Sequence, residues 1–240
     1  KTASFSQNAA SGTGGAVYIG GGDILELDGC TFTGNTAEKD GGAIGTADSS
    51  SSAKFSKGIK NSTFEGNKAK HYRGGAIYYA IATTETLVID SCVFKNNAVA
   101  TNTSAAAGGA IWSNRNLTIQ GQGLFKGNTS TNNLGGAIYL TFGTNGTTYT
   151  IKDQTFEDNS AKYGGAICTY NSGITVSITG STFKNNTATK YGAVIYNVAT
   201  VTIDADSKFE GNQSAEGDNV KKDGETIAGF YNTGGTFTFQ

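Results

Sequence analysis

The sequence predicts an all-β fold, a right-handed parallel β-helix of about eight coils with three strands in each coil. Two observations predict it. A Phe-x-x-Asn motif recurs eight times, with successive phenylalanines 27, 32, 30, 31, 31, 27 and 26 residues apart. A Gly-Gly-Ala-(Ile/Val) block follows six of these motifs. Self-similarity at one period is typical of repeat architectures, in which each unit stacks on the previous one.

Each full repeat contains three short segments that we expect to be strands. The first is the Gly-Gly-Ala block, as in 41–44, the second an alternating segment such as 117–119, and the third carries the phenylalanine, as in 30–32. Each has period-two alternation and many β-branched residues, which indicates strands. Equivalent strands of successive coils are expected to pair at about 4.8 Å. Parallel crossovers are right-handed by strong preference.

The Phe-x-x-Asn motifs predict both a corner and a ladder. The eight pairs are Phe5/Asn8, Phe32/Asn35, Phe64/Asn67, Phe94/Asn97, Phe125/Asn128, Phe156/Asn159, Phe183/Asn186 and Phe209/Asn212. The third residue of each motif, directly before the asparagine, is mostly Gly, Asn or Asp. These residues tolerate positive φ. A left-handed corner is therefore expected there. The stacked asparagines should satisfy turn backbone groups that water does not reach.

Charged residues recur at fixed places in the repeat. One past each phenylalanine, Glu65 should face Lys95, and the residues at 126, 157, 184 and 210 alternate in sign. A second column follows the middle strand, beginning with Asp28, Lys60 and Asp90. Opposite charges on adjacent strands help to fix register. We interpret both columns as solvated register ladders rather than as a site.

Composition bounds the domain organisation and the partners. Residues 1–240 are predicted to form one β-helix domain, with 213–240 an irregular or capping C-terminal coil, because the repeat runs nearly end to end. No apolar run approaches the roughly 20 residues of a membrane span, so no integral membrane segment is expected. The formal net charge of −1 and the lack of a basic stripe argue against nucleic acid as a partner.

Cysteine and histidine usage gives no sign of a metal site and says little about the redox compartment. Cys30 and Cys92 occupy equivalent positions two coils apart, roughly 9–10 Å, which is too far for a disulfide. We expect them to be small buried members of a stack, and Cys168 to be unpaired. His71 is the single histidine and is expected to be solvated. We therefore expect no catalytic residue, no metal site and no cofactor.

The residue after each block's Ile or Val is the candidate ligand-binding position. At four coils it is aromatic: Tyr18, Tyr78, Trp112 and Tyr139. Alternation places it opposite the inward apolar residue, so these side chains are predicted to form an outward, broken aromatic stripe that stacks on sugar faces or anchors a protein. The later positions are expected to be Cys168 and Ile195. Spacings vary between the block and the middle strand, which predicts loops on one face, often the binding face of a solenoid. These loops are expected at 45–58, 79–86, 98–107 and 141–148.

The alternating GGA(I/L/V) and FxxN motifs resemble the passenger domains of the chlamydial polymorphic outer membrane proteins. The resemblance covers roughly residues 5 to 212, and related motifs recur in adhesin-like surface proteins of other microbes. It implies a secreted β-helix at the cell surface or outside the cell. It also implies a non-enzymatic adhesin that binds a host-cell protein or glycan. Flanking domains of a longer chain are a further possible partner.

Two alternatives remain open at this stage. Many polysaccharide lyases and glycosidases use this fold, and they need convergent carboxylates in a groove. Glu85 and Asp90 are the candidate unpaired carboxylates, with Arg73 nearby. The fold alone does not favour this alternative. The other alternative is a passive structural spacer that carries another domain.

Overall fold

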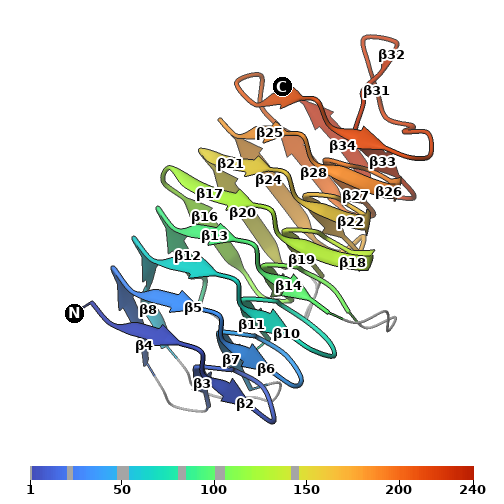
Figure 1. The fold of residues 1–240 in the computed structure, drawn as a ribbon. Coiled ribbons are helices and arrows are strands. Elements are labelled where there is room, and N and C mark those ends of the chain that lie inside the picture. Colours follow the sequence, from blue (N-terminus) through green and yellow to red (C-terminus); the bar gives the residue numbers. More distant parts are fainter. Residues whose placement is uncertain (1, 21–23, 48–53, 81–84, 101–105, 142–145) are drawn as a thin grey trace.

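The computed structural model describes residues 2–20, 24–47, 54–80, 85–100, 106–141 and 146–240. These residues form a parallel β-solenoid without a helix, and its coils rise from the N-terminal to the C-terminal end of Figure 1. Four sheets run along the solenoid, each with eight strands, and every neighbouring pair within them is parallel. The predicted parallel β-helix is confirmed. The prediction of three strands per coil is wrong, because each coil contributes to four sheets.

The four sheets follow one another around every coil. Sheet A carries the phenylalanines and consists of β1 (Ser4–Ser6), β5 (Thr31–Thr33), β9 (Thr63–Glu65), β13 (Val93–Lys95), β17 (Gly123–Lys126), β21 (Gln154–Glu157), β25 (Thr182–Lys184) and β29 (Lys208–Glu210). Sheet B follows the asparagines and consists of β2 (Ala9–Ala10), β6 (Thr36–Ala37), β10 (Lys68–Ala69), β14 (Ala98–Val99), β18 (Thr129–Leu134), β22 (Ser160–Tyr163), β26 (Thr187–Tyr191) and β30 (Gln213–Ser214). Five of its eight strands have two residues, too few to show an alternating pattern.

The Gly-Gly-Ala block leads into sheet C, and the alternating segment forms sheet D. Sheet C consists of β3 (Val17–Ile19), β7 (Ile44–Thr46), β11 (Ile77–Tyr79), β15 (Ile111–Ser113), β19 (Ile138–Leu140), β23 (Ile167–Thr169), β27 (Ile195–Asn197) and β33 (Phe230–Asn232). Sheet D consists of β4 (Ile24–Asp28), β8 (Lys54–Lys60), β12 (Leu87–Asp90), β16 (Leu117–Gln120), β20 (Thr148–Lys152), β24 (Thr175–Thr179), β28 (Thr200–Ile203) and β34 (Thr236–Phe239). One apolar core runs between the sheets.

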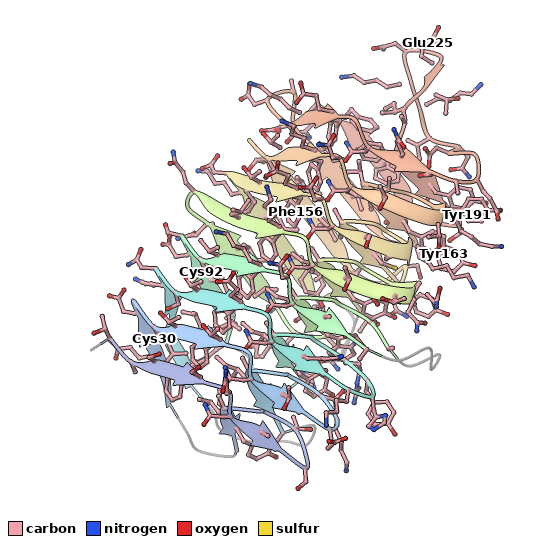
Figure 2. All side chains as sticks on the ribbon, viewed as in Figure 1. Cys30, Cys92, Phe156, Tyr163, Tyr191 and Glu225 are labelled. Atoms are coloured by element: carbon pink, nitrogen blue, oxygen red, sulfur yellow. The ribbon has the colours of Figure 1, made fainter. Side chains whose placement is uncertain are left out.

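The left-handed corners are confirmed at all eight predicted positions. They are Gln7, Gly34, Gly66, Asn96, Gly127, Asp158, Asn185 and Gly211, with φ between 53° and 65°. Inside these corners the phenylalanine rings stack with centroids 4.7–5.5 Å apart (Phe156 in Figure 2). Because this distance is close to the strand spacing, every coil places its ring directly over the previous one.

The predicted asparagine ladder is also confirmed, and Asn97 shows its pattern. Its Nδ2 donates to Asn128 Oδ1 at 3.0 Å and to the Phe64 carbonyl at 2.9 Å. Its backbone N–H also donates to Asn128 Oδ1, at 3.0 Å. Its own Oδ1 accepts from the Asn67 amide and side chain. The buried side chain thus meets the hydrogen-bonding needs of a corner that is closed to water.

The seventh Gly-Gly-Ala block is shifted by one residue from the sequence-based alignment. Ile195 pairs with Ile167 of the preceding coil, and Tyr196 pairs with Cys168. The prediction that Ile195 occupies the outward position is therefore wrong, because Ile195 is completely buried and Tyr196 is the outward residue. Gly192 has the positive φ of the first glycine, and Ala193 stands in place of the second.

The charge columns lie in the predicted register. Glu65 is opposite Lys95, and Lys126 is opposite Glu157, with Nζ 3.1 Å from Oε2. The hydrogen bond to Glu157 raises the pKa of Lys126. On sheet D, Lys60 lies between Asp28 and Asp90. These columns therefore act on strand register, as expected for cross-strand pairs.

The last part of the chain returns to the sheets after an irregular segment. Strands β33 and β34 extend sheets C and D. Between β30 and β33 an antiparallel hairpin of β31 (Lys221–Lys222) and β32 (Glu225–Thr226) projects from the solenoid, with Glu225 near its tip (Figures 1 and 2). We propose that this coil caps the core, since Phe230, Phe237 and Phe239 pack edge to face over its end. No helix in the described residues is long and apolar enough to span a membrane.

The three cysteines are free thiols buried in the solenoid, as predicted for stack members. Burial raises the pKa of Cys92 to about 11, compared with 9.0 for an ordinary thiol. Two pKa units lower the thiolate fraction roughly hundredfold at pH 8. We expect iodoacetamide at pH 8 to alkylate none of the three thiols of the native protein within the time that labels all three in 8 M urea, as measured by intact mass. Rapid native labelling at Cys92 contradicts this placement.

A candidate ligand-binding site at the outer face of sheet C

The register of sheet C brings the predicted aromatic residues into one column outside the core. Its members, from coil to coil, are Tyr18, Gly45, Tyr78, Trp112, Tyr139, Cys168, Tyr196 and Tyr231. The preceding residue of each strand, such as Ile111 or Ile138, belongs to the core. Tyr78, Trp112 and Tyr139 form a separate apolar cluster with Ala80, Ala107 and Cys168. We call this the outer cluster.

The four aromatic residues lie on the predicted outward side of sheet C, but three of them are covered by other side chains. Tyr18 is 56% exposed, but Tyr78 is 1% exposed, and Trp112 and Tyr139 are each 7% exposed. Side chains from a neighbouring column of residues, Arg73 among them, cover these rings. The Arg73 guanidinium lies 4.4 Å from the ring centroid of Tyr78 and 4.9 Å from that of Trp112. The middle of the stripe is therefore almost completely covered.

The covering column was missed by the sequence reasoning. It consists of the residue immediately before the first glycine of each block: Thr13, Asp40, Arg73, Ala107, Leu134, Tyr163 and Tyr191. The following glycine turns the chain with positive φ, 64° at Gly74. Because of this turn the column lies at the edge of sheet C, against the outer cluster. The sequence signal for this column is its constant position, directly before the first glycine of each block.

A hollow of about 660 Å³ lies between the two columns. It is lined by Thr13, Lys39, Asp40, Tyr72, Arg73, Ala107, Trp112, Leu134, Tyr139 and Thr141. Its volume is in the usual range of small-ligand sites, roughly 300–1,000 Å³. Of the four residues predicted from the stripe, the hollow brings together Trp112 and Tyr139, while Tyr18 and Tyr78 do not line it.

An ion pair fixes one wall of the hollow. Arg73 Nε donates to Asp40 Oδ1 at 2.8 Å, and the Arg73 backbone N–H donates to the same oxygen at 3.1 Å. Arg73 Nη2 lies 3.4 Å from Asp40 Oδ2. The Asp40 side chain is only 5% exposed. A planar guanidinium held by a carboxylate on one side and by ring faces below has little freedom, so this wall is preorganised.

The neighbouring charges at the rim are paired among themselves. Glu38 accepts a hydrogen bond from Lys70 Nζ at 2.6 Å and lies 3.4 Å from His71 Nε2. The hydrogen bond from Lys70 lowers the pKa of Glu38. The His71 side chain is 55% exposed, in agreement with its predicted solvation.

The opposite wall is held by hydroxyl groups. Burial raises the pKa of Tyr139, and its hydroxyl is hydrogen-bonded to Thr141. The Tyr149 hydroxyl, which has one proton to donate, lies 2.5 Å from the Thr141 carbonyl oxygen and 3.0 Å from that of Ser113. Tyr170, which is 52% exposed, lies with its ring centroid 6.0 Å from that of Tyr139. This tyrosine is a further exposed aromatic residue that the stripe pattern did not predict.

A second group of tyrosines follows towards the C-terminal end. Tyr163 and Tyr191 lie close together at one edge of the solenoid (Figure 2). They meet Tyr196 and Tyr231, with Tyr191 stacked on Tyr231 at 4.0 Å. A hydrogen bond to Glu216 raises the pKa of Tyr191 to about 12. These contacts attach the irregular C-terminal segment to the solenoid.

Parts of the four predicted binding loops lie outside the described residues, namely 48–53, 81–84, 101–105 and 142–145. The described ends of two of them reach the hollow. Ala107 ends one predicted loop and Thr141 begins another, and both line it.

Asp90 and Arg73, two of the residues named for the polysaccharide-cleaving alternative, lie beside different sheets. Asp90 accepts hydrogen bonds from Gln120 at 3.0 Å and Ser91 at 2.8 Å, so the prediction that it is unpaired is wrong. The bond from Gln120 lowers the pKa of Asp90. Asp90 lies on sheet D, whereas Arg73 pairs with Asp40 beside sheet C. Among the described residues no three His, Cys, Asp or Glu side chains are grouped to hold a metal ion.

The stacked coils and the asparagine ladder define the class, a parallel β-solenoid built from GGA and FxxN repeats. The Chlamydia polymorphic membrane protein repeat matches six segments of the chain, residues 2–20, 29–47, 61–80, 122–141, 155–170 and 180–198. The chain belongs to the family of proteins that carry this repeat, in agreement with the resemblance seen in its sequence. This is a family of surface-associated outer membrane proteins. No curated protein and no solved structure matches the chain.

Proposed function

We propose that this chain is a surface-displayed, non-enzymatic adhesin module, exposed outside the cell, that binds a host-cell receptor or glycan in the hollow beside Trp112 and Tyr139. The observation that carries the proposal is the composition of the hollow. Two aromatic residues, Trp112 and Tyr139, the Asp40–Arg73 pair and two threonines line a space of about 660 Å³. Apolar walls with a few well-placed polar groups are typical of binding sites.

The arrangement favours binding over catalysis. The Asp40 carboxylate already accepts hydrogen bonds from the Arg73 side chain and backbone, so its lone pairs are largely occupied. A glycosidase needs two carboxyl groups about 5–10 Å apart across the scissile bond. Asp40 is the single carboxylate in the lining of the hollow. Fixed polar groups of this kind lower the entropic cost of binding, which suits recognition.

The test measures binding and turnover together. The purified protein is incubated with a glycan panel and with cultured epithelial cells, and retained protein and released sugar are both quantified. Saturable retention without released sugar is the expected result. Released sugar means an enzyme, and retention on neither surface favours the passive spacer.

We predict that Tyr72→Ala weakens retention about tenfold, because Tyr72 lines the hollow with 39% of its surface exposed. The binding isotherm on cells or glycan checks this. Tyr18→Ala is the matched control, since Tyr18 is an exposed tyrosine outside the hollow. A loss with Tyr18→Ala and none with Tyr72→Ala places the site on the N-terminal part of the stripe instead.

A further inference from the structure

The hollow beside sheet C is elongated along the direction in which the coils stack. Half of its lining residues belong to the column before the first glycine of each block, namely Thr13, Asp40, Arg73, Ala107 and Leu134. These positions come from five successive coils, because the glycine after each one donates its N–H to the carbonyl of the next member, as Gly14 does to Asp40. Four coil steps of about 4.8 Å give the hollow a length of roughly 19 Å.

The volume of the hollow fits a single extended chain over this length. Spread over roughly 19 Å, about 660 Å³ averages roughly 35 Å² in cross-section. That cross-section is the width of one chain of sugars or of amino acids. A single sugar would fill only a part of the space.

Two exposed tyrosines extend the same surface. Tyr72 lines the hollow in the third coil and is 39% exposed. Tyr170, which is 52% exposed, is the sixth-coil equivalent of Thr141, a lining residue, because Leu140 pairs with Thr169. The two tyrosines are three coils apart, or roughly 14 Å along the axis. Tyr72 precedes its strand of sheet C and Tyr170 follows its own, so a ligand that contacts both rings crosses the outer face of sheet C obliquely.

The chemistry of this surface favours a glycan over a peptide. The strands of sheet C are paired on both sides, as Ile111 is with Ile77 and Ile138, so a peptide lying across the coils finds no strand edge to extend. Threonine and tyrosine hydroxyls both donate and accept hydrogen bonds, as sugar hydroxyls do. Tyrosine also combines an apolar ring with a polar tip, which suits a pyranose with its apolar faces and hydroxyl-bearing rim.

We infer that the ligand is an extended, β-linked chain of at least about four pyranoses, which lies across the stacked coils from Tyr72 to Tyr170. The inference rests on the proposed binding function and adds the class and the orientation of the ligand. A β-1,4-linked chain is nearly straight, and each of its sugars advances by nearly the distance between two coils. Successive coils therefore meet successive sugars.

Linear glycans of defined length test the inference. β-1,4-linked N-acetylglucosamine and β-1,4-linked glucose oligomers of one to six units are titrated into the protein by isothermal titration calorimetry. The α-1,4-linked glucose oligomers, which curl into a helix, are the control for shape. We expect at least one β-linked series to bind about tenfold or more tightly at five units than at two, and the α-linked series to gain less.

The length series also separates this inference from the proposed function. Affinity that is independent of length, an equal gain in the α-linked series, or no binding to either β-linked series overturns the inference. Saturable retention on cells or on the glycan panel then still supports an adhesin, and retention on cells alone indicates a protein receptor. Retention on neither surface overturns the proposed function as well.

Three exposed tyrosines locate the ligand. Tyr72→Ala and Tyr170→Ala are each expected to weaken binding of the five-unit oligomer about tenfold, because each ring contacts a different part of a long chain. Tyr18→Ala is the matched control, and unchanged circular dichroism shows that each variant is folded. A loss with Tyr72→Ala and none with Tyr170→Ala confines the ligand to the hollow. That result overturns the extended chain and leaves the proposed binding function intact.

Discussion

Replacing Gly136 with alanine is expected to destabilise the solenoid by at least about 3 kcal/mol, lowering the midpoint of urea unfolding followed by circular dichroism. A Cβ on Gly136 would lie 2.0 Å from the Gly165 carbonyl oxygen and 2.6 Å from that of Ser160. Both obstacles are backbone, and Gly136 N–H also donates to the Gly164 carbonyl at 2.9 Å. Two coils must therefore separate to admit one methyl group.

Gly66→Ala is the matched control for this prediction. Gly66 has a positive φ of 65°, and a Cβ there meets nothing within 4 Å. Its cost is limited to the left-handed conformation, about 1–2 kcal/mol. If both variants lose the same stability, coil-to-coil contact is not what requires the second glycine.

The shifted seventh block provides a natural example of the same rule. Ala193 occupies the place of the second glycine there, and its N–H donates to Ser214 Oγ rather than to a following Gly-Gly block. The next coil departs from the repeat, and Val194 instead donates to the Gly229 carbonyl. A Cβ is tolerated where no Gly-Gly backbone stacks on top. The second glycine is thus a requirement of stacking and not of the turn.

Much of the fold could be predicted from the sequence because the repeat reports the stacking directly. A phenylalanine and an asparagine at a constant spacing must lie over their equivalents, so the corner and the ladder followed from one motif. The fourth sheet did not follow, since a strand such as β6 (Thr36–Ala37) has no alternation to detect. The slip at Ile195 arose because Gly192-Ala193-Val194 imitates the block one residue early.

The candidate site was only partly predictable. Alternation within one strand gives the side of the sheet on which Trp112 lies, but its burial depends on Arg73, which precedes the block of another coil. The Asp40–Arg73 pair joins residues 33 positions apart in the chain. Such contacts become visible only when the residue before each block is compared from coil to coil, because the turn at the first glycine brings that column against sheet C.

Replacing Asn128 with alanine is expected to cost roughly 3–5 kcal/mol, because it leaves buried polar groups without partners in the middle of the ladder. Asn128 Oδ1 accepts from the Asn97 N–H, and its Nδ2 donates to the Phe94 carbonyl at 2.9 Å. Alanine satisfies neither group, and the corner is closed to water, since Asn97, Phe94 and Asn128 are all fully buried. Urea unfolding monitored by circular dichroism measures the loss.

Asn8→Ala separates this effect from a general preference for asparagine at the corner. Asn8 is exposed, and its side chain makes a hydrogen bond to Asn35 Oδ1, which the Asn8 backbone N–H also reaches. Its loss is expected to cost less than about 1 kcal/mol, since water replaces the bond. In a repeat protein each coil is stabilised by its neighbours. Loss of the Asn128 side chain therefore weakens the coupling between the N-terminal and C-terminal halves of the solenoid. Loss of the Asn8 side chain affects the first coil alone. A shallower, broader transition for Asn128→Ala alone is therefore expected, and equal effects of the two variants contradict a ladder that couples the coils.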